Sequence, residues 1–241
     1  MTIETVFVVI PARNESALIS RCLRSLELAV EVLQYGPAPP SVHIVVVLDR
    51  CTDDTAELVS SFGWVDTVEV DAGSVGVARS VGVASALARL QVETDRAWIA
   101  NTDADSAVPP QWLVEQVRLA NSGADVVIGS VSPVMADLTD DLADAWHRVR
   151  RRRSPAGHVH GANLGFRASS YIVAGGFTSE ALHEDVSLVA RMSAASAAVC
   201  SSLDIDVTTS GRKQNRLSGG YASYLHDGSL VSRAFSEDLT G

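Results

Sequence analysis

The sequence lacks the features that mark several large classes of protein. Its 241 residues hold no uninterrupted apolar stretch of about 18 residues, so we expect no transmembrane helix. The three cysteines, Cys22, Cys51 and Cys200, form no CxxC pair and are odd in number, which predicts reduced thiols. The N-terminus has an apolar run but neither a basic start nor a small-residue cleavage site, and we therefore expect a cytoplasmic protein.

Basic residues are also scarce. There are 19 Lys and Arg against 29 Asp and Glu, a formal net charge of −10, and Lys213 is the one lysine. This balance disfavours a protein that wraps nucleic acid, because such a protein needs a basic surface. A local basic patch or a bound metal can still attract an anionic ligand. With 46% hydrophobic residues the chain can bury a large core, and one α/β domain over residues 1–241 fits its length.

Up to about residue 131, short β-rich runs alternate with longer amphipathic stretches. The expected strands are 6–10, 42–48, 65–70, 97–101 and 124–130, and the expected helices are 16–33, 52–62, 75–90 and one that Pro109 and Pro110 open. Repeated strand–helix–strand units predict a mostly parallel, Rossmann-like sheet flanked by helices. Ligands bind at the carboxyl ends of the strands in such sheets.

Three charged clusters follow expected strands: Arg13-Asn14-Glu15, Asp49-Arg50 and Asp103-Ala104-Asp105. The carboxylates of Asp103 and Asp105 can share one hard cation, Mg²⁺ or Mn²⁺, with a diphosphate. The same two residues are also typical of a turn and a helix start.

Two further residues are candidate nucleotide ligands. Asp49 ends an apolar run, where a carboxylate can accept an N–H of a nucleobase. Arg79 lies near the start of an expected helix and can contact a base or a phosphate, or lie exposed on the surface. The glycines around it do not form GxGxxG, which disfavours a dinucleotide-dependent dehydrogenase.

The later part of the chain carries a second set of charges. Glu184 and Asp185 open an apolar-periodic run, either as acids favoured at a helix start or with one of them as a general base for an acceptor hydroxyl. Membrane attachment through Arg148 to Arg153 stays open. Arg148 and Arg150 to Arg153 otherwise predict a solvated helix face, or a loop that binds a phosphorylated acceptor or folds over the donor diphosphate. Arg212, Lys213 and Arg216 form a basic cluster with the same alternatives.

Together these segments resemble the family 2 glycosyltransferases with a GT-A fold. The resemblance runs in order through VVIPARNE, VVVLDRCTDDTAEL, GVARSVGV, IANTDADSAVPPQWL, GANLGFRASSYIVAGGF and HEDVSLVARM, from about Val6 to Met192. It implies a single GT-A domain with a nucleotide-sugar-binding half, 1–131, and a smaller acceptor-side half, 132–241.

The resemblance also implies a role for each matching residue. Those that would border the nucleoside are Pro11, Arg13, Glu15, Asp49 and Arg79. Asp103 would lie near the ribose or the metal, Asp105 would bind the metal, Asp185 would be the catalytic base and Glu184 would orient the acceptor. Gly161 and Asn163 would line the acceptor side. Arg13 departs from the family, because many members have an aromatic residue there that stacks on the base.

The implied activity is metal-dependent, inverting transfer of a sugar, a hexose by expectation, from a UDP- or GDP-linked donor to an acceptor hydroxyl. Mn²⁺ or Mg²⁺ would stabilise the leaving diphosphate. One alternative is an inactive nucleotide-binding module of the same fold, which the presence of both Asp105 and Asp185 disfavours. The other is a DxD phosphohydrolase, a class that places its aspartates after the first strand, whereas here they follow the fourth. His226 is a metal-ligand candidate by loose analogy.

Overall fold

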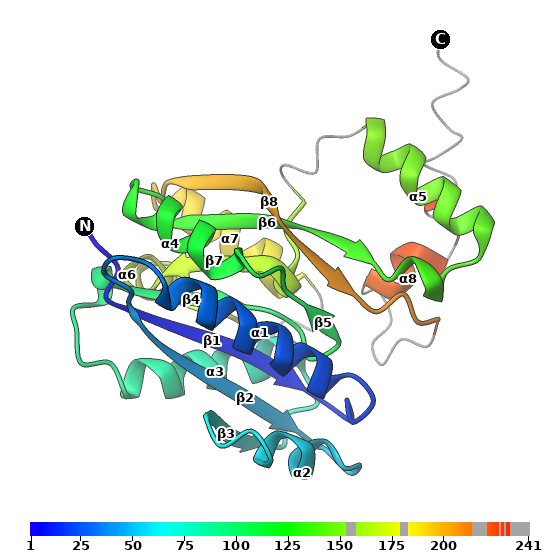
Figure 1. Ribbon diagram of the computed structural model, residues 1–241. Coiled ribbons are helices and arrows are strands. Elements are labelled where there is room, and N and C mark those ends of the chain that lie inside the picture. Colours follow the sequence, from blue (N-terminus) through cyan, green and yellow to red (C-terminus); the bar gives the residue numbers. More distant parts are fainter. Residues whose placement is uncertain (153–157, 179–182, 214–220, 227, 229, 232–241) are drawn as a thin grey trace.

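The chain folds around one mixed sheet with helices on both faces (Figure 1). The computed structural model describes residues 1–152, 158–178, 183–213, 221–226, 228 and 230–231. Within these ranges the sheet has eight strands in the order β3-β2-β1-β4-β7-β6-β8-β5. The strands are β1 (Thr5–Ala12), β2 (Ser41–Asp49), β3 (Val65–Val70), β4 (Ala97–Asn101), β5 (Ser106–Ala107), β6 (Val126–Pro133), β7 (Leu164–Arg167) and β8 (Val199–Thr209).

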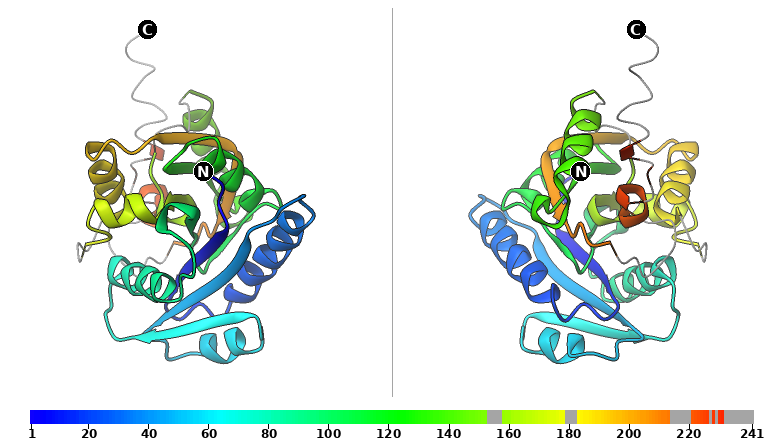
Figure 2. Two further views of the ribbon diagram at one scale, coloured as in Figure 1. Left: turned by 90° about the vertical axis from the view of Figure 1, so that its left-hand side faces the viewer. Right: turned by 90° about the vertical axis from the view of Figure 1, so that its right-hand side faces the viewer.

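The helices divide between the two faces of the sheet (Figure 2). They are α1 (Ile19–Gln34), α2 (Thr55–Ser60), α3 (Val75–Ala88), α4 (Trp112–Asn121), α5 (Asp140–Arg152), α6 (Ala168–Val173), α7 (Glu184–Ala194) and α8 (Tyr221–His226), with the short 3-10 turns η1 (Thr94–Arg96), η2 (Met135–Asp137) and η3 (Gly161–Asn163). Apolar side chains of α1, α2 and α4 pack in one core cluster, and those of α3, α6 and α7 in another. The central strands β1 and β4 are buried because helices cover both of their faces.

Strands β7 and β5 give the sheet its mixed character, since β5 pairs antiparallel with β8. Strands β3, β2, β1 and β4 are mutually parallel, and β6 is parallel to β8, but β7 runs antiparallel to both β4 and β6. Leu164, which starts β7, is paired with Asn101, which ends β4. The turn η3 before β7 therefore lies at the edge of the sheet where β1, β2 and β4 end.

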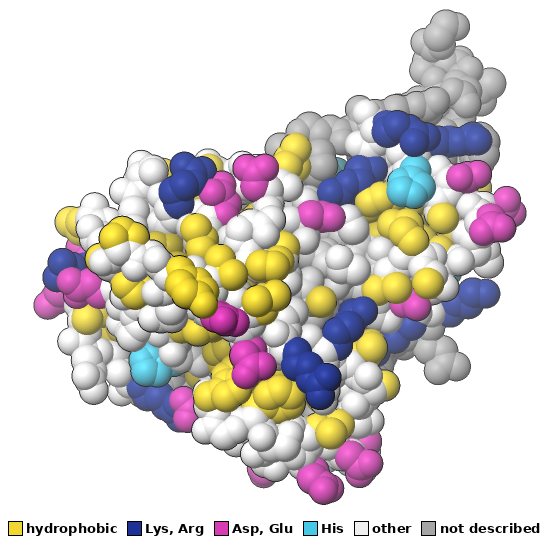
Figure 3. Space-filling model, in the orientation of Figure 1, with side chains coloured by type: hydrophobic (Ala, Val, Ile, Leu, Met, Phe, Trp, Pro, Cys, Tyr) yellow, Lys and Arg dark blue, Asp and Glu magenta, His cyan; other side chains and the backbone are white. Residues whose placement is uncertain are grey.

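Helices α5 and α8 project beyond the ends of β6 and β8 (Figure 1). They share a small apolar cluster of their own, with Ala145 and Trp146 of α5 against Leu225 and Leu230. The predicted arginine run lies on α5, where Arg148 and Arg151 are exposed. Figure 3 shows basic side chains on this projection with acidic ones beside them, and Arg153 and Arg216 lie outside the described residues.

The predicted α/β fold is confirmed, and the five expected strands all form. The helix predicted from Pro109 begins at Trp112, because Pro109 and Pro110 belong to the turn before it. Strands β5, β7 and β8 were not predicted, since β5 and β7 have only two and four residues. Every helix in the described ranges is too short or too polar to cross a bilayer.

Candidate active site

Charged side chains gather at the edge of the sheet where the parallel strands end. Asp103 and Asp105 follow β4, Glu15 follows β1, and Glu184 and Asp185 begin α7. The structure thus brings together residues predicted for the donor half and for the acceptor half.

Arg79 joins the two halves. Its side chain is 4% exposed, donates one hydrogen bond of 2.6 Å from Nη2 to Oδ1 of Asp103, and forms an ion pair through Nη1 with Glu184. Helix α3 presents this arginine beneath the site, and Ser74 caps the helix by accepting from the N–H of Val77. The structure therefore assigns Arg79 two internal carboxylate partners, and its predicted nucleoside contact stays a prediction.

Gly161 lies directly against the guanidinium of Arg79. A Cβ atom at this position would overlap three guanidinium atoms, so any other residue would force the guanidinium to shift. The N–H of Gly161 donates to Oδ2 of Asp185 at 2.6 Å, and Asp185 also accepts from the N–H of Val186 at 2.8 Å. These two bonds orient the carboxylate of the predicted base at the N-terminus of α7.

Burial shifts the titration of two neighbours of Asp185. The pKa of Glu184 is raised, chiefly by burial and against the opposing effect of Arg79. The pKa of His160, which precedes Gly161, is lowered by burial against the opposing charge of Asp185. His160 also contacts the ring of Tyr221 edge-on, with the ring centroids 5.6 Å apart. No sequence pattern singles out His160, because only the fold brings it near Asp185.

Asp105 lies in an environment that disfavours its charge. Burial raises the pKa of its carboxyl to about 6, with a further contribution from Asp103 and an opposing one from Arg212. Its Oδ1 accepts from the hydroxyl of Thr209 at 3.2 Å, and its Oδ2 lies 3.0 Å from Nη2 of Arg212. Both partners come from the C-terminal end of β8: Thr209 is the last residue of the strand, and Arg212 lies in the segment that follows it.

Arg212 also binds Glu15. The guanidinium makes a bidentate contact with the Glu15 carboxylate, at 2.8 and 2.9 Å. The backbone N–H of Glu15 donates to Oγ1 of Thr55 at 2.7 Å. Glu15 thus holds Arg212 at the site, and the partners of this arginine could not be predicted from its basic neighbours in sequence.

The other predicted nucleoside residues lie at the ends of β1 and β2. Asp49 is buried, and its Oδ1 accepts from the N–H groups of Ala72 and Gly73 at 3.0 and 2.8 Å, which fixes the loop before α3. Pro11 and Arg13 are half-buried at the end of β1. A nucleoside role for these three residues stays a prediction.

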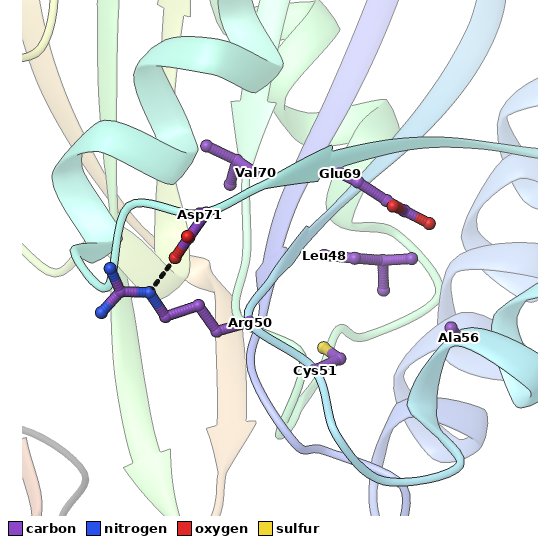
Figure 4. A pocket seen from close by; sticks show the side chains of 7 residues that line it. All are labelled: Leu48, Arg50, Cys51, Ala56, Glu69, Val70 and Asp71. Carbon is purple, nitrogen blue, oxygen red and sulfur yellow. Dashed lines mark hydrogen bonds and ion pairs between the residues drawn. The ribbon is translucent and has the colours of Figure 1, made fainter.

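A cavity of about 340 Å³ lies near Asp49 but does not include it (Figure 4). Its lining residues are Leu48, Arg50, Cys51, Ala56, Glu69, Val70 and Asp71, and an ion pair joins Arg50 to Asp71. None of them is a predicted site residue, so we place the candidate active site at the charged cluster and not in this cavity.

Asn163 is fully buried beneath the site. Its Oδ1 accepts from Nε1 of Trp112 at 2.8 Å, and its Nδ2 donates to the carbonyl oxygens of Ser130 at 2.7 Å and of Ile205. These bonds attach η3 to α4, β6 and β8. The acceptor-side role predicted for Asn163 and Gly161 stays a prediction.

The carboxylates of Asp103 and Asp105 fit a hard divalent cation. Both offer oxygen ligands, Asp103 is one-third exposed, and burial together with the neighbouring Asp103 charge raises the pKa of Asp105, an effect that a bound cation would oppose. Among the described residues no three His, Cys, Asp or Glu side chains cluster as a complete metal site. Nε2 of His226 lies 2.8 Å from the carbonyl oxygen of Gly211, so the structure pairs this ring with the backbone.

Comparison with known proteins gives one family and a set of structures with the same fold. The sequence model of glycosyl transferase family 2 matches residues 7–171. No curated protein sequence matches significantly.

Three solved structures illustrate the structural similarity. TarS from S. aureus with UDP-GlcNAc has 15% identity and a TM-score of 0.64, over 98% of this chain and 67% of that one. The mannosyltransferase PcManGT from Pyrobaculum calidifontis with GDP-Man and Mn²⁺ has 19% identity and a TM-score of 0.63. The match covers 100% of this chain and 65% of PcManGT. Glucosyl-3-phosphoglycerate synthase from Mycobacterium tuberculosis with Mn²⁺, UDP and glucosyl-3-phosphoglycerate has 16% identity and a TM-score of 0.56. The match covers 88% of this chain and 73% of the synthase. This chain spans only 61% of another TarS structure, solved with UDP.

Proposed function

Because this chain belongs to glycosyl transferase family 2, we propose that it transfers a sugar from a nucleotide-diphosphate donor to an acceptor hydroxyl, with inversion and with a divalent cation. One observation carries the proposal. The two aspartates after β4 and the acidic pair that begins α7 meet at one edge of the sheet, and Arg79 links them through Asp103 and Glu184. A diphosphate site and a general base are thereby held next to each other.

The base is Asp185. Its carboxylate is oriented by the N–H groups of Gly161 and Val186, so it can accept the proton of an acceptor hydroxyl without first reorienting. The acceptor oxygen attacks the anomeric carbon from the face opposite the leaving diphosphate. This is a single displacement that forms no covalent intermediate with the enzyme. Glu184, held by Arg79, orients the acceptor, and Gly161 and Asn163 lie on the acceptor side.

Asp105 and Asp103 would hold the cation. Mn²⁺ or Mg²⁺ held by these carboxylates would supply positive charge to the leaving diphosphate. Arg79 fixes Asp103 in place, and the hydroxyl of Thr209 donates to Asp105.

The donor is UDP- or GDP-linked. Similar folds were solved with UDP-GlcNAc and with GDP-Man and Mn²⁺, which supports this donor class. The nucleoside is bordered in this proposal by residues at or just after the ends of β1 and β2: Pro11, Arg13, Glu15 and Asp49.

A panel of UDP- and GDP-sugars tests the proposal without a known acceptor. With Mn²⁺ present, we expect one donor to raise the melting temperature and to be hydrolysed slowly to the nucleoside diphosphate. Asp185→Asn should keep the thermal shift and lose at least about 100-fold in hydrolysis, the usual contribution of a general base. Asp66→Asn, which alters a partly exposed carboxylate of β3, is the matched control and should hydrolyse like the wild type.

The outcomes separate the alternatives. No thermal shift with any donor contradicts the proposed donor site, and full activity of Asp185→Asn removes Asp185 as the base. A thermal shift without hydrolysis, in the presence of a panel of sugar and alcohol acceptors, supports the inactive binding module. Release of inorganic phosphate from simple phosphate esters supports the phosphohydrolase.

A further inference from the structure

The two aspartates of the site are held by two arginines in a repeated arrangement. Asp103 pairs with Arg79, whose other arm pairs with Glu184. Asp105 pairs with Arg212, whose other contact is with Glu15. Each aspartate thus has one guanidinium as its counter-ion, and each guanidinium has one glutamate as its second partner.

The two arginines differ in their access to solvent. The Arg79 side chain is 4% exposed and is enclosed by α3, Gly161 and Glu184. The Arg212 side chain is 32% exposed and belongs to the segment after β8. Movement of Arg79 would leave Glu184 buried without its partner, which is costly. Glu15 is also buried, but Arg212 can turn its Nη2 from Asp105 toward solvent while its Nη1 keeps the 2.9 Å bond to Glu15.

Arg212 lies where it competes with a cation. Its Nη2 is 3.0 Å from Oδ2 of Asp105, and the proposed function gives this carboxylate to the metal. Two positive charges on one carboxylate repel each other, and the repulsion is strong in a site that is mostly buried. A divalent cation at Asp105 therefore requires the guanidinium to withdraw.

We propose that Arg212 is an exchangeable counter-ion: it neutralises Asp105 while the site is free of metal, and it is displaced when a divalent cation binds. Arg212 thereby lowers the affinity of the site for a divalent cation when no donor is bound. The more strongly Arg212 competes, the more the binding of the cation depends on the donor. The inference rests on the proposed metal dependence. Arg79, by contrast, is a permanent partner of Asp103.

A different role for the same contacts predicts a different result. If Arg212 only attaches Glu15 to the end of β8, its removal lowers stability and leaves the metal affinity unchanged. If it acts only as one positive charge among several, any nearby arginine has the same effect. Arg21 supplies the control, because its Nη2 donates to the backbone oxygen of Asp105 at 2.8 Å and is not paired with the carboxylate in the described contacts.

The test is the binding of Mn²⁺ alone to the full chain, by titration calorimetry and by the Mn²⁺ electron paramagnetic resonance signal, without any nucleotide. We expect Arg212→Gln to bind Mn²⁺ about fivefold more tightly than the wild type, the scale of a partly exposed charge-assisted contact. Arg212→Lys keeps the charge but not the two-point contact, and should lie between the two. Arg21→Gln should stay within about twofold of the wild type.

The results distinguish failure of the inference from failure of the proposed function. The inference is overturned if Arg212→Gln is folded, as judged by its melting curve, and binds Mn²⁺ with the affinity of the wild type. It is also overturned if Arg21→Gln gains as much Mn²⁺ affinity as Arg212→Gln. Should Arg212→Gln not fold, the comparison of Arg212→Lys with the wild type decides in the same way. Asp105→Asn should abolish Mn²⁺ binding; if it binds as the wild type does, the proposed metal site is wrong, and the inference falls with it.

Discussion

At the scale of single residues, the buried carboxyl of Asp105 makes the stability of the folded protein depend on pH. The pKa of its carboxyl is raised from 3.8 to about 6, chiefly by burial. The folded protein therefore binds this proton more tightly than the unfolded chain does. The contribution of Asp105 to stability falls as the pH rises from about 3.8 to 6, because the buried group must then ionise.

Replacement of this carboxyl should remove that dependence. We expect Asp105→Asn, in EDTA, to gain about 1–3 kcal/mol in unfolding free energy relative to the wild type at pH 7.5, and less than half of that gain at pH 4.5. Urea unfolding at the two pH values measures both differences. Asp66→Asn is the matched control, and a gain for Asp105→Asn that is equal at both pH values would contradict the burial argument.

The sequence was sufficient to find the carboxylates of the site but not their partners. Asp103, Asp105, Glu184 and Asp185 could be predicted because each follows a strand or opens a helix. Which arginine pairs with which carboxylate could not be predicted, since Arg79 and Glu184 are 105 residues apart and the pair of Glu15 and Arg212 spans 197. Such pairs depend on which strands become neighbours in the sheet, and local pattern does not contain that information.

At the scale of elements, the reversed strand β7 places η3 in the site. The loops that follow the parallel strands lie at this edge. Because β7 runs in the opposite direction, the segment at this edge is the turn that precedes β7. The predicted parallel units could not reveal this, because β7 has only four residues and lies between strands that come earlier in the chain. The position of Gly161 against Arg79 follows from that reversal.

A side chain at Gly161 should therefore disrupt the site. We expect Gly161→Ala to lose about 1–3 kcal/mol in unfolding free energy, the usual cost of overpacking, together with most of the transfer activity, since the N–H that orients Asp185 would move. Gly63→Ala is the matched control, because no atom lies within 4 Å of the Cβ that alanine would add there, and it should change stability by less than about 0.5 kcal/mol. Equal urea midpoints for the two variants would show that Arg79 can move aside.

At the scale of the whole molecule, α5 and α8 form a unit that is separate from the main core. Their apolar cluster is small, and it lies beyond the strand ends, as Figure 1 shows. Arg150 connects the unit to the sheet through a 2.9 Å ion pair with Asp206 and lies 4.9 Å from the centre of the Trp146 ring. Because this apolar cluster is small and separate from the main core, local unfolding of the unit should cost less than global unfolding.

Hydrogen exchange can detect such local opening. We expect Trp146→Ala to speed exchange of the amides in α5 and α8 at least about tenfold, with little change in β1 and β4. Trp98→Ala is the contrasting control, because Trp98 is fully buried in the main core and its loss should cost about 3–5 kcal/mol and speed exchange throughout the sheet. Uniform acceleration in Trp146→Ala would show that the molecule unfolds as one unit.

The enclosure of Arg79 also constrains recombination. A chimaera that joins residues 1–131 of this chain to the later part of another member of the fold would place Arg79 against a foreign turn and a foreign helix. It would retain every predicted donor residue, but Arg79 would be accommodated only if the second parent also supplies a glycine against the guanidinium and a glutamate that neutralises it. A crossover that keeps α3, η3 and the first turn of α7 from one parent meets this requirement with any partner sequence.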